Sequence, residues 1–149
     1  MKFALAMSFA LLACNASFSH QLPQMSSQQS STVFQNSSWR LERWESQGSA
    51  VALVPQAAVS LHFQDQQVNG FGGCNNFAGS FNLVNDKFSV GALDATQKGC
   101  ATPIMNQENQ FLTALQSARR YSVDATGRLS LFYGSDDSEG ILYFLPTKQ

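Results

Sequence analysis

Two cysteines, Cys74 and Cys100, restrict how this chain can fold more than any other residues in it. The third cysteine, Cys14, directly follows an apolar segment at the start of the chain. If Cys14 is lipidated or is removed with that segment, Cys74 and Cys100 remain as one pair in an oxidising compartment. A disulfide between them would stabilise the fold by roughly 3 to 4 kcal/mol, according to the loop-closure estimate. This is a large fraction of the stability of a small domain.

The start of the chain has the pattern of an export signal. Lys2 supplies a positive charge, and residues 3–13 are almost entirely apolar. The run is shorter than the roughly 20 residues of a membrane-spanning helix and suits the apolar part of a signal peptide. Leu11-Leu12-Ala13-Cys14 resembles a bacterial lipobox, in which cleavage precedes a lipidated cysteine. Ordinary cleavage after Ala16 or Ser19 is the alternative, because either would leave a small residue at the cleavage site.

The sequence predicts three parts, which are a signal peptide at 1–13, a lipidated or flexible tether at 14–35 and one domain at 36–149. The tether is polar and low in complexity, with too little apolar surface to fold. The remaining length suits a single domain, and 12 phenylalanines supply bulk for its core. We therefore expect a cell-envelope protein. It would be an outer-membrane lipoprotein facing the periplasm, or a soluble periplasmic protein if Cys14 carries no lipid.

The charge of the chain excludes some classes of partner. Charged residues make up only 13% of the sequence, and the formal net charge is −1. Such a chain has no long-range field to attract nucleic acid or an anionic membrane surface. We therefore expect no nucleic-acid partner, and membrane contact only through a lipid on Cys14. The expected partner is an envelope protein or a small ligand, bound by a monomer.

The hydrophobic pattern predicts strands around a single helix. Strands are expected from Trp39 onward and at 59–64, 68–71, 77–83, 87–90, 120–123, 129–133 and 141–145, most clearly where apolar and polar residues alternate. The helix is expected to begin with Thr102 as its N-cap and Pro103 in the first turn, and to end with Arg119 and Arg120. The predicted fold class is α+β, a mostly antiparallel, strongly curved and barrel-like sheet with one main helix packed against it.

Thiol chemistry is the main enzymatic alternative. A nucleophilic cysteine needs a nearby base, and the histidines are His20 in the tether and His62 on the polar face of a strand. The chain has no C-x-x-C motif of a thiol–disulfide exchanger. A structural disulfide is the preferred interpretation. Free thiols, or a thiol-dependent enzyme using Cys74 or Cys100 with His62, stay open as alternatives.

Other site chemistry finds less support in the sequence. The acidic residues at 136–139 could contact calcium, but they lack the spacing of an EF-hand loop. Two separated histidines and no close cysteine pair give zinc too few ligands. We therefore expect no catalytic residue, no cofactor and no metal site. An inhibitor that blocks a secreted hydrolase with the loop at 134–140 is a further alternative.

The segments around both cysteines also resemble a known family. A glycine-rich bend precedes Cys74-Asn75, a spaced aromatic strand follows, and a threonine lies shortly before Cys100. Together with an opening W-x-L, this succession resembles the META domain, the family of HslJ-type heat-shock proteins. The residues that carry the resemblance are Trp39, Leu41, Gly70, Gly73, Cys74, Asn75, Phe77, Gly79, Phe81, Thr96 and Cys100. It spans about 38–144 and implies a non-enzymatic role in envelope stress, virulence or drug tolerance, without an agreed active site.

Overall fold

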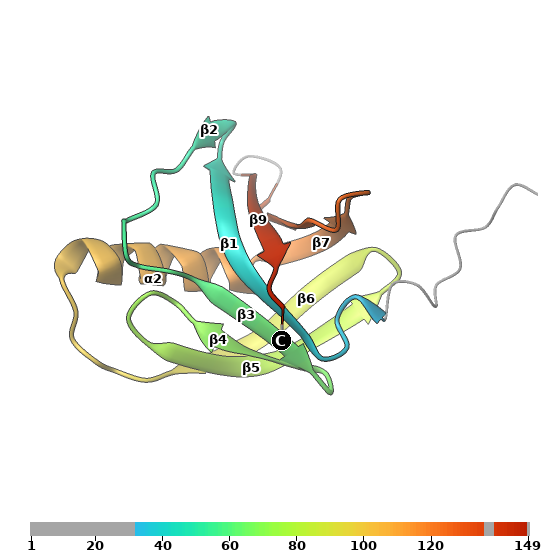
Figure 1. The fold of residues 1–149 in the computed structure, drawn as a ribbon, viewed down its shortest axis with the longest axis horizontal. Coiled ribbons are helices and arrows are strands. Elements are labelled where there is room, and N and C mark those ends of the chain that lie inside the picture. The colour runs from blue at the N-terminus through green and yellow to red at the C-terminus, as the bar shows by residue number, and fades with distance from the viewer. Residues whose placement is uncertain (1–31, 136–138, 149) are drawn as a thin grey trace, which may run out of the picture.

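The computed structural model describes residues 32–135 and 139–148 (Figure 1). The predicted signal peptide, Cys14, His20 and most of the acidic segment at 136–139 lie outside these ranges. The described elements are β1 (Ser37–Ser46), β2 (Ser49–Ala50), β3 (Ser60–Gln64), β4 (Gln67–Phe71), β5 (Asn76–Val84), β6 (Lys87–Ala95), α2 (Thr102–Gln116), β7 (Ala118–Val123), β8 (Leu129–Tyr133) and β9 (Gly140–Pro146). Within this part of the chain, no helix has the length and apolar character needed to cross a membrane.

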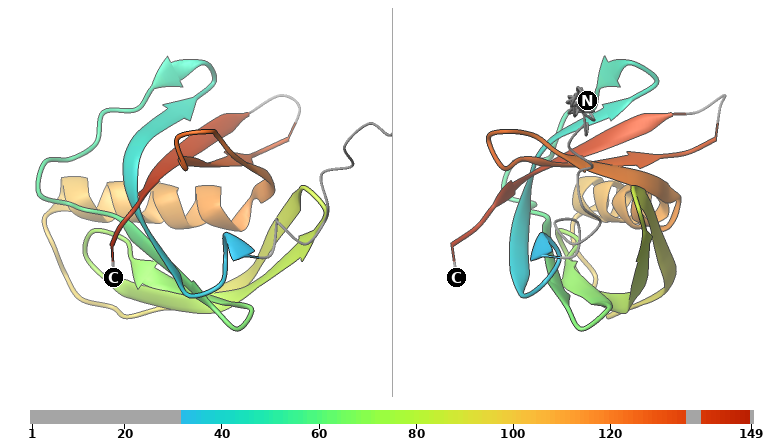
Figure 2. Two further views of the ribbon diagram at one scale, coloured as in Figure 1. Left: turned by 45° about the vertical axis from the view of Figure 1, so that its right-hand side comes forward. Right: turned by 90° about the vertical axis from the view of Figure 1, so that its right-hand side faces the viewer.

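The strands form one antiparallel sheet that closes on itself. Their order is β2-β1-β3-β4-β5-β6-β7-β8-β9, and β1 also pairs with β9. Eight strands therefore make a closed barrel, while the short β2 only extends β1 as a hairpin. Figure 2 shows the strong curvature of the sheet and helix α2 beside it. The predicted α+β class, with a barrel-like sheet and one helix, is confirmed.

One seam of the barrel is much weaker than the others. β6 and β7 share a single register pair, between Lys87 and Arg120. Past this pair, Tyr121 bonds the turn before β6, since its backbone N–H donates to the carbonyl of Asp86 and its hydroxyl donates to the carbonyl of Asn85. On the other side, helix α2 connects the two strands and contacts β6. The chain thus replaces a continuous β6–β7 ladder with one pair and a helix.

Aromatic rings fill the interior of the barrel. Phe63 and Phe88 lie within the barrel, and Phe111 brings the buried face of α2 against Phe77 and Phe144. These side chains come from strands and a helix far apart in the sequence. Their burial supplies the main driving force for folding, because apolar burial stabilises by about 25 cal/mol per Å² removed from water.

The folded core begins earlier than the predicted boundary at Asn36. Phe34, which the sequence analysis placed in the tether, is only 2% exposed. Its ring centroid lies 4.8 Å from that of Phe63 and 4.9 Å from that of Tyr121, both in edge-to-face geometry. Two adjacent apolar residues, Val33 and Phe34, in a polar segment give no periodic signal, so the sequence pattern missed them. The packed domain therefore includes Phe34.

We expect Phe34→Leu to lower the free energy of unfolding by about 1 to 2 kcal/mol. The substitution keeps most of the apolar volume but removes the edge-to-face contacts with the neighbouring rings. Urea denaturation measures the loss. The exposed neighbour Gln35→Ala is the control and should change stability by less than about 0.5 kcal/mol. Equal stability of both variants would contradict the placement of Phe34 in the core.

The ends of helix α2 differ from the prediction. Ala101, not Thr102, is the N-cap, and no side chain caps the first turn. The helix ends at Gln116, and Ser117 is its C-cap, whose backbone N–H donates to the carbonyls of Leu115 and Thr113. Arg119 and Arg120 therefore belong to β7 and not to the last helical turn. Pairing of this segment with β8 outweighs the local preference for positive charge at a helix end.

Candidate functional site

The family-motif residues meet where the bend between β4 and β5 contacts helix α2. Cys74 is buried in this bend, and a disulfide joins it to Cys100 with 6.0 Å between the α-carbons. The structure thus contains the predicted cysteine pairing. With each sulfur bonded to the other, neither serves as a free thiol nucleophile. His62, the proposed helper base, instead has its Nδ1 atom 2.9 Å from the hydroxyl of Ser38 on β1.

A buried carboxyl group organises the bend. Glu108 of helix α2 is 4% exposed. Its Oε2 atom accepts the backbone N–H of Cys74 at 2.9 Å and that of Asn75 at 2.6 Å. Its Oε1 atom accepts the side-chain amide of Asn75 at 2.7 Å. One helical side chain therefore supplies acceptors for three donors that the bend would otherwise leave buried and unpaired.

Asn75 extends this network to a third segment of chain. Its Oδ1 atom accepts the backbone N–H of Lys98 at 2.6 Å and the hydroxyl of Thr96 at 2.9 Å. The segment after β6 is thereby fixed to the bend both by the disulfide and by hydrogen bonds. We call this group the Glu108 cluster, consisting of Cys74, Asn75, Thr96, Lys98, Cys100 and Glu108. Its hydrogen bonds and disulfide hold together the bend, helix α2 and the segment after β6, so its role is structural.

The remaining motif residues are also used in packing. Trp39, Leu41, Phe77 and Phe81 are core side chains. The motif glycines lie where neighbouring backbone comes close or where the chain turns. A β-carbon on Gly70 would collide with the carbonyl of Ser60, and one on Gly79 would lie 2.6 Å from the carbonyl of Ala92. Gly73 has a φ of +116°, a conformation that other residues rarely adopt.

Gly72 gives a direct test of the Glu108 cluster. A β-carbon at this position would lie 2.8 Å from both Cγ and Oε2 of Glu108. We expect Gly72→Ala to displace that carboxyl group and to destabilise the domain by about 1 to 3 kcal/mol. Gly99→Ala is a suitable control, because nothing lies within 4 Å of its added methyl group. If the two alanine variants unfold at the same denaturant concentration, the close packing of Glu108 on the bend is refuted.

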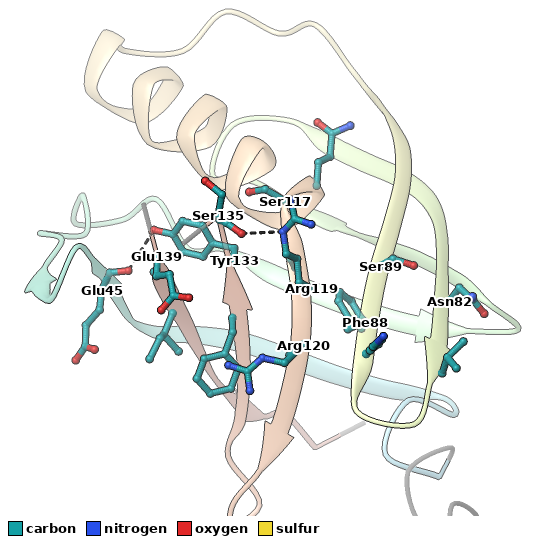
Figure 3. Close-up of a pocket in the computed structure, with 18 of the residues that line it drawn as sticks. Glu45, Asn82, Phe88, Ser89, Ser117, Arg119, Arg120, Tyr133, Ser135 and Glu139 are labelled. Atoms are coloured by element: carbon teal, nitrogen blue, oxygen red, sulfur yellow. Dashed lines mark hydrogen bonds between the residues drawn. The ribbon is translucent and has the colours of Figure 1, made fainter. Parts of the chain in front are cut away.

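A second feature lies on the outside of the barrel, at the weak seam. An open groove of about 1110 Å³ is lined by residues of strands β5 to β9, the end of α2 and the β1–β2 hairpin. Figure 3 shows Arg119 and Arg120 of β7 along one side and Ser89 of β6 with Asn82 of β5 along the other. The sequence pattern did not predict this groove, because Arg119 and Arg120 were expected at the end of the helix.

The groove concentrates positive charge. The Nε–H of Arg119 donates to the carbonyl of Gly134 at 2.8 Å, which orients the guanidinium. The guanidinium of Arg120 lies 4.9 Å from the ring centroid of Phe132. Within residues 32–135 and 139–148, neither arginine nor Lys87 forms a salt bridge with a carboxylate. Their charges therefore face solvent.

The opposite end of the groove carries acidic residues, Glu45 and Glu139. Glu45 is already engaged, since it pairs with Arg43 at 2.9 Å and accepts the hydroxyl of Tyr143 at 3.2 Å. Burial, followed by the hydrogen bond and charge of Glu45, raises the pKa of Tyr143. The described residues contain no group of three or more metal-ligating side chains.

The fold and the Glu108 cluster define a class of small antiparallel barrel, closed between its first and last strands and fastened at one bend by a disulfide. The META domain model matches residues 32–146. The chain belongs to the META domain family.

Solved structures agree with this assignment. An NMR structure of a protein from Burkholderia xenovorans is 27% identical and covers 81% of this chain and 88% of its own, with a TM-score of 0.70. A second protein solved by NMR shares the fold at 20% identity, with a TM-score of 0.56 and coverage of 80% of this chain and 92% of its own. Comparison with curated proteins gave no match.

Proposed function

We propose that this META domain protein is a non-enzymatic binding protein of the cell envelope, which acts through its outer groove. One observation carries this proposal. Asn75 and Thr96 are hydrogen-bonded, and Cys74 and Cys100 are disulfide-bonded, within the Glu108 cluster. In contrast, Lys87, Arg119 and Arg120 are exposed in an open groove. The buried Glu108 cluster stabilises the barrel, and the exposed cations, which form no salt bridge within residues 32–135 and 139–148, can bind a partner.

The proposed location rests on the start of the sequence. The apolar segment at 3–13 and the lipobox-like residues before Cys14 favour export and lipid attachment. A lipid there would place the domain at the outer membrane, on a tether facing the periplasm. The disulfide suits that oxidising compartment. The resemblance to HslJ-type proteins adds a role in envelope stress or drug tolerance to the proposal.

Lipid attachment is tested by feeding cells a clickable fatty acid. We expect the wild-type protein to be labelled and to sediment with membranes, and the Cys14→Ala variant to be unlabelled. A labelled Cys14→Ala protein, or an unlabelled wild-type protein, would contradict the anchor.

In-cell crosslinking tests binding. A photo-reactive amino acid is placed at Ser89, which is exposed and lines the groove, or at Asn69, which is exposed on β4 outside it. We expect a discrete protein adduct from position 89 and none from position 69, together with an envelope-stress phenotype on deletion of the gene. If position 89 yields no adduct at equal expression and deletion leaves the envelope unaltered, the proposed function fails.

A further inference from the structure

The single β6–β7 pair brings like charges together. Lys87 lies directly opposite Arg120, and Arg119 precedes Arg120 on β7. Like charges directly opposite each other on neighbouring strands destabilise a sheet. Here the repulsion falls at the seam where the barrel has the fewest backbone bonds to offset it. A bound anion would relieve this repulsion, so the arrangement favours a ligand with negative charge.

The groove is large and is lined by many strands. Its lining residues come from five consecutive strands, β5 to β9, and its volume is about 1110 Å³. A single inorganic ion would occupy only a small part of this volume. The groove has room for several residues of an extended peptide, whose carboxylates would lie beside Lys87, Arg119 and Arg120.

The lining also offers apolar contacts next to the cations. Val84 is 55% exposed, which is unusual for a large apolar side chain, and it lies on the groove. Phe132 supports the guanidinium of Arg120 with its ring, and such stacking leaves the N–H groups at the edge of the guanidinium able to bind a carboxylate. Ile141 adds a further apolar surface. The groove therefore suits a chain that carries both carboxylates and apolar side chains.

We propose that the groove binds an extended acidic segment of a partner protein. Carboxylates of that segment meet Lys87, Arg119 and Arg120, and its apolar side chains contact Val84 and Phe132. This inference rests on the proposed binding function and names the chemistry of the partner. A flat anionic membrane is disfavoured, because the site is concave.

The test titrates the isotope-labelled exported protein, disulfide intact, with an eight-residue peptide of alternating glutamate and valine. Backbone amide NMR shifts report where the peptide binds. We expect shifts concentrated at residues 87–89 and 119–121, with a dissociation constant on the order of 0.1 to 1 mM, typical of a short isolated segment. The matched peptide with glutamine in place of every glutamate should bind at least about tenfold more weakly.

Charge variants then separate the groove from general electrostatics. The pair Lys87→Gln and Arg120→Gln should weaken peptide binding at least about tenfold. The matched pair Arg40→Gln and Lys148→Gln removes two exposed cations outside the groove and should leave the affinity within about twofold. In addition, Lys87→Gln alone should raise the melting temperature by about 1 to 4 °C, because it removes the cross-strand repulsion.

Several outcomes would overturn the inference. If both variant pairs weakened peptide binding equally, the binding would depend only on the net charge of the protein. If the glutamine peptide bound as tightly as the glutamate peptide, the carboxylates would have no role in binding. Binding to anionic phosphatidylglycerol vesicles through Lys87 and Arg120, without peptide binding, would replace the peptide with a membrane. A crosslinked partner at Ser89 with no binding of the acidic peptide would sink this inference alone. Loss of that crosslink and of the deletion phenotype would sink the proposed function instead.

Discussion

Replacing Glu108 with alanine is expected to lower the free energy of unfolding by about 3 to 5 kcal/mol. The substitution leaves the backbone N–H groups of Cys74 and Asn75 and the side-chain amide of Asn75 without their acceptor in a buried site. Each unpaired buried donor costs roughly 1 to 3 kcal/mol, and water entering the vacated space recovers part of the total. Denaturant unfolding of the oxidised protein measures the loss. One m-value, the slope of the unfolding free energy against denaturant concentration, is used for both proteins.

Two further variants show whether the acceptor geometry is responsible. Glu108→Gln keeps the shape but turns an NH₂ group toward a donor, so we expect an intermediate loss of about 1 to 3 kcal/mol. Asn75 does not relieve the conflict by rotating its amide, because its Oδ1 atom already accepts from Thr96 and Lys98. The exposed helix residue Gln110→Ala should cost less than about 0.5 kcal/mol. A Glu108→Ala protein as stable as Gln110→Ala would show that the carboxyl group does not hold the bend.

Removing the disulfide is expected to cost about 3 to 4 kcal/mol. The bridge closes a loop with a sequence separation of 26, which contains β5, β6 and the hairpin between them. In its absence the unfolded chain gains the entropy of that loop, and the folded chain keeps its hydrogen bonds. The double variant Cys74→Ala with Cys100→Ala, compared with wild type in urea, measures this loss.

The same comparison under a strong reductant gives the control. Wild type should then fall to about the stability of the double variant, while the double variant itself should not respond to the reductant. Because Cys74 belongs to both the bridge and the hydrogen-bond network, we also expect the losses from the disulfide and from Glu108→Ala to be non-additive. Wild-type protein whose stability is indifferent to the reductant would contradict a stabilising bridge.

The strands and the helix could be predicted because their signals are local. Val59 to Gln64 alternates apolar and polar residues, and β3 begins one residue inside that run. The helix pattern from Ile104 to Leu115 lies within α2. The prediction that the helix extends to Arg120 was wrong, because the segment from Ala118 onward pairs with β8 and Ala118 is buried there. No local sequence pattern encodes this pairing. β6 likewise continues to Ala95, five residues past the predicted end at Val90, since β5 offers it partners.

The candidate site was harder to predict. Glu108 interrupts the apolar face of the helix pattern, and a carboxyl group in that position is itself a signal of a buried acceptor. Asn75 was named only as a motif residue, and the structure shows that it binds Thr96 and Lys98, more than twenty residues along the chain. The groove depends on the separation of β6 from β7, which follows from the closure of the whole barrel. Sequence patterns report periodicity within one segment and do not predict contacts between segments that are distant in the sequence.

The pairing of β1 with β9 has a consequence for when the barrel can close during synthesis of the chain. The N–H of Thr147 donates to the carbonyl of Ser38, so the two ends of the domain meet only when almost all of it is present. Contacts this distant form slowly, because the entropy of a long loop must be lost before they contribute stability. The barrel of such a chain therefore closes only after its final strand has been synthesised.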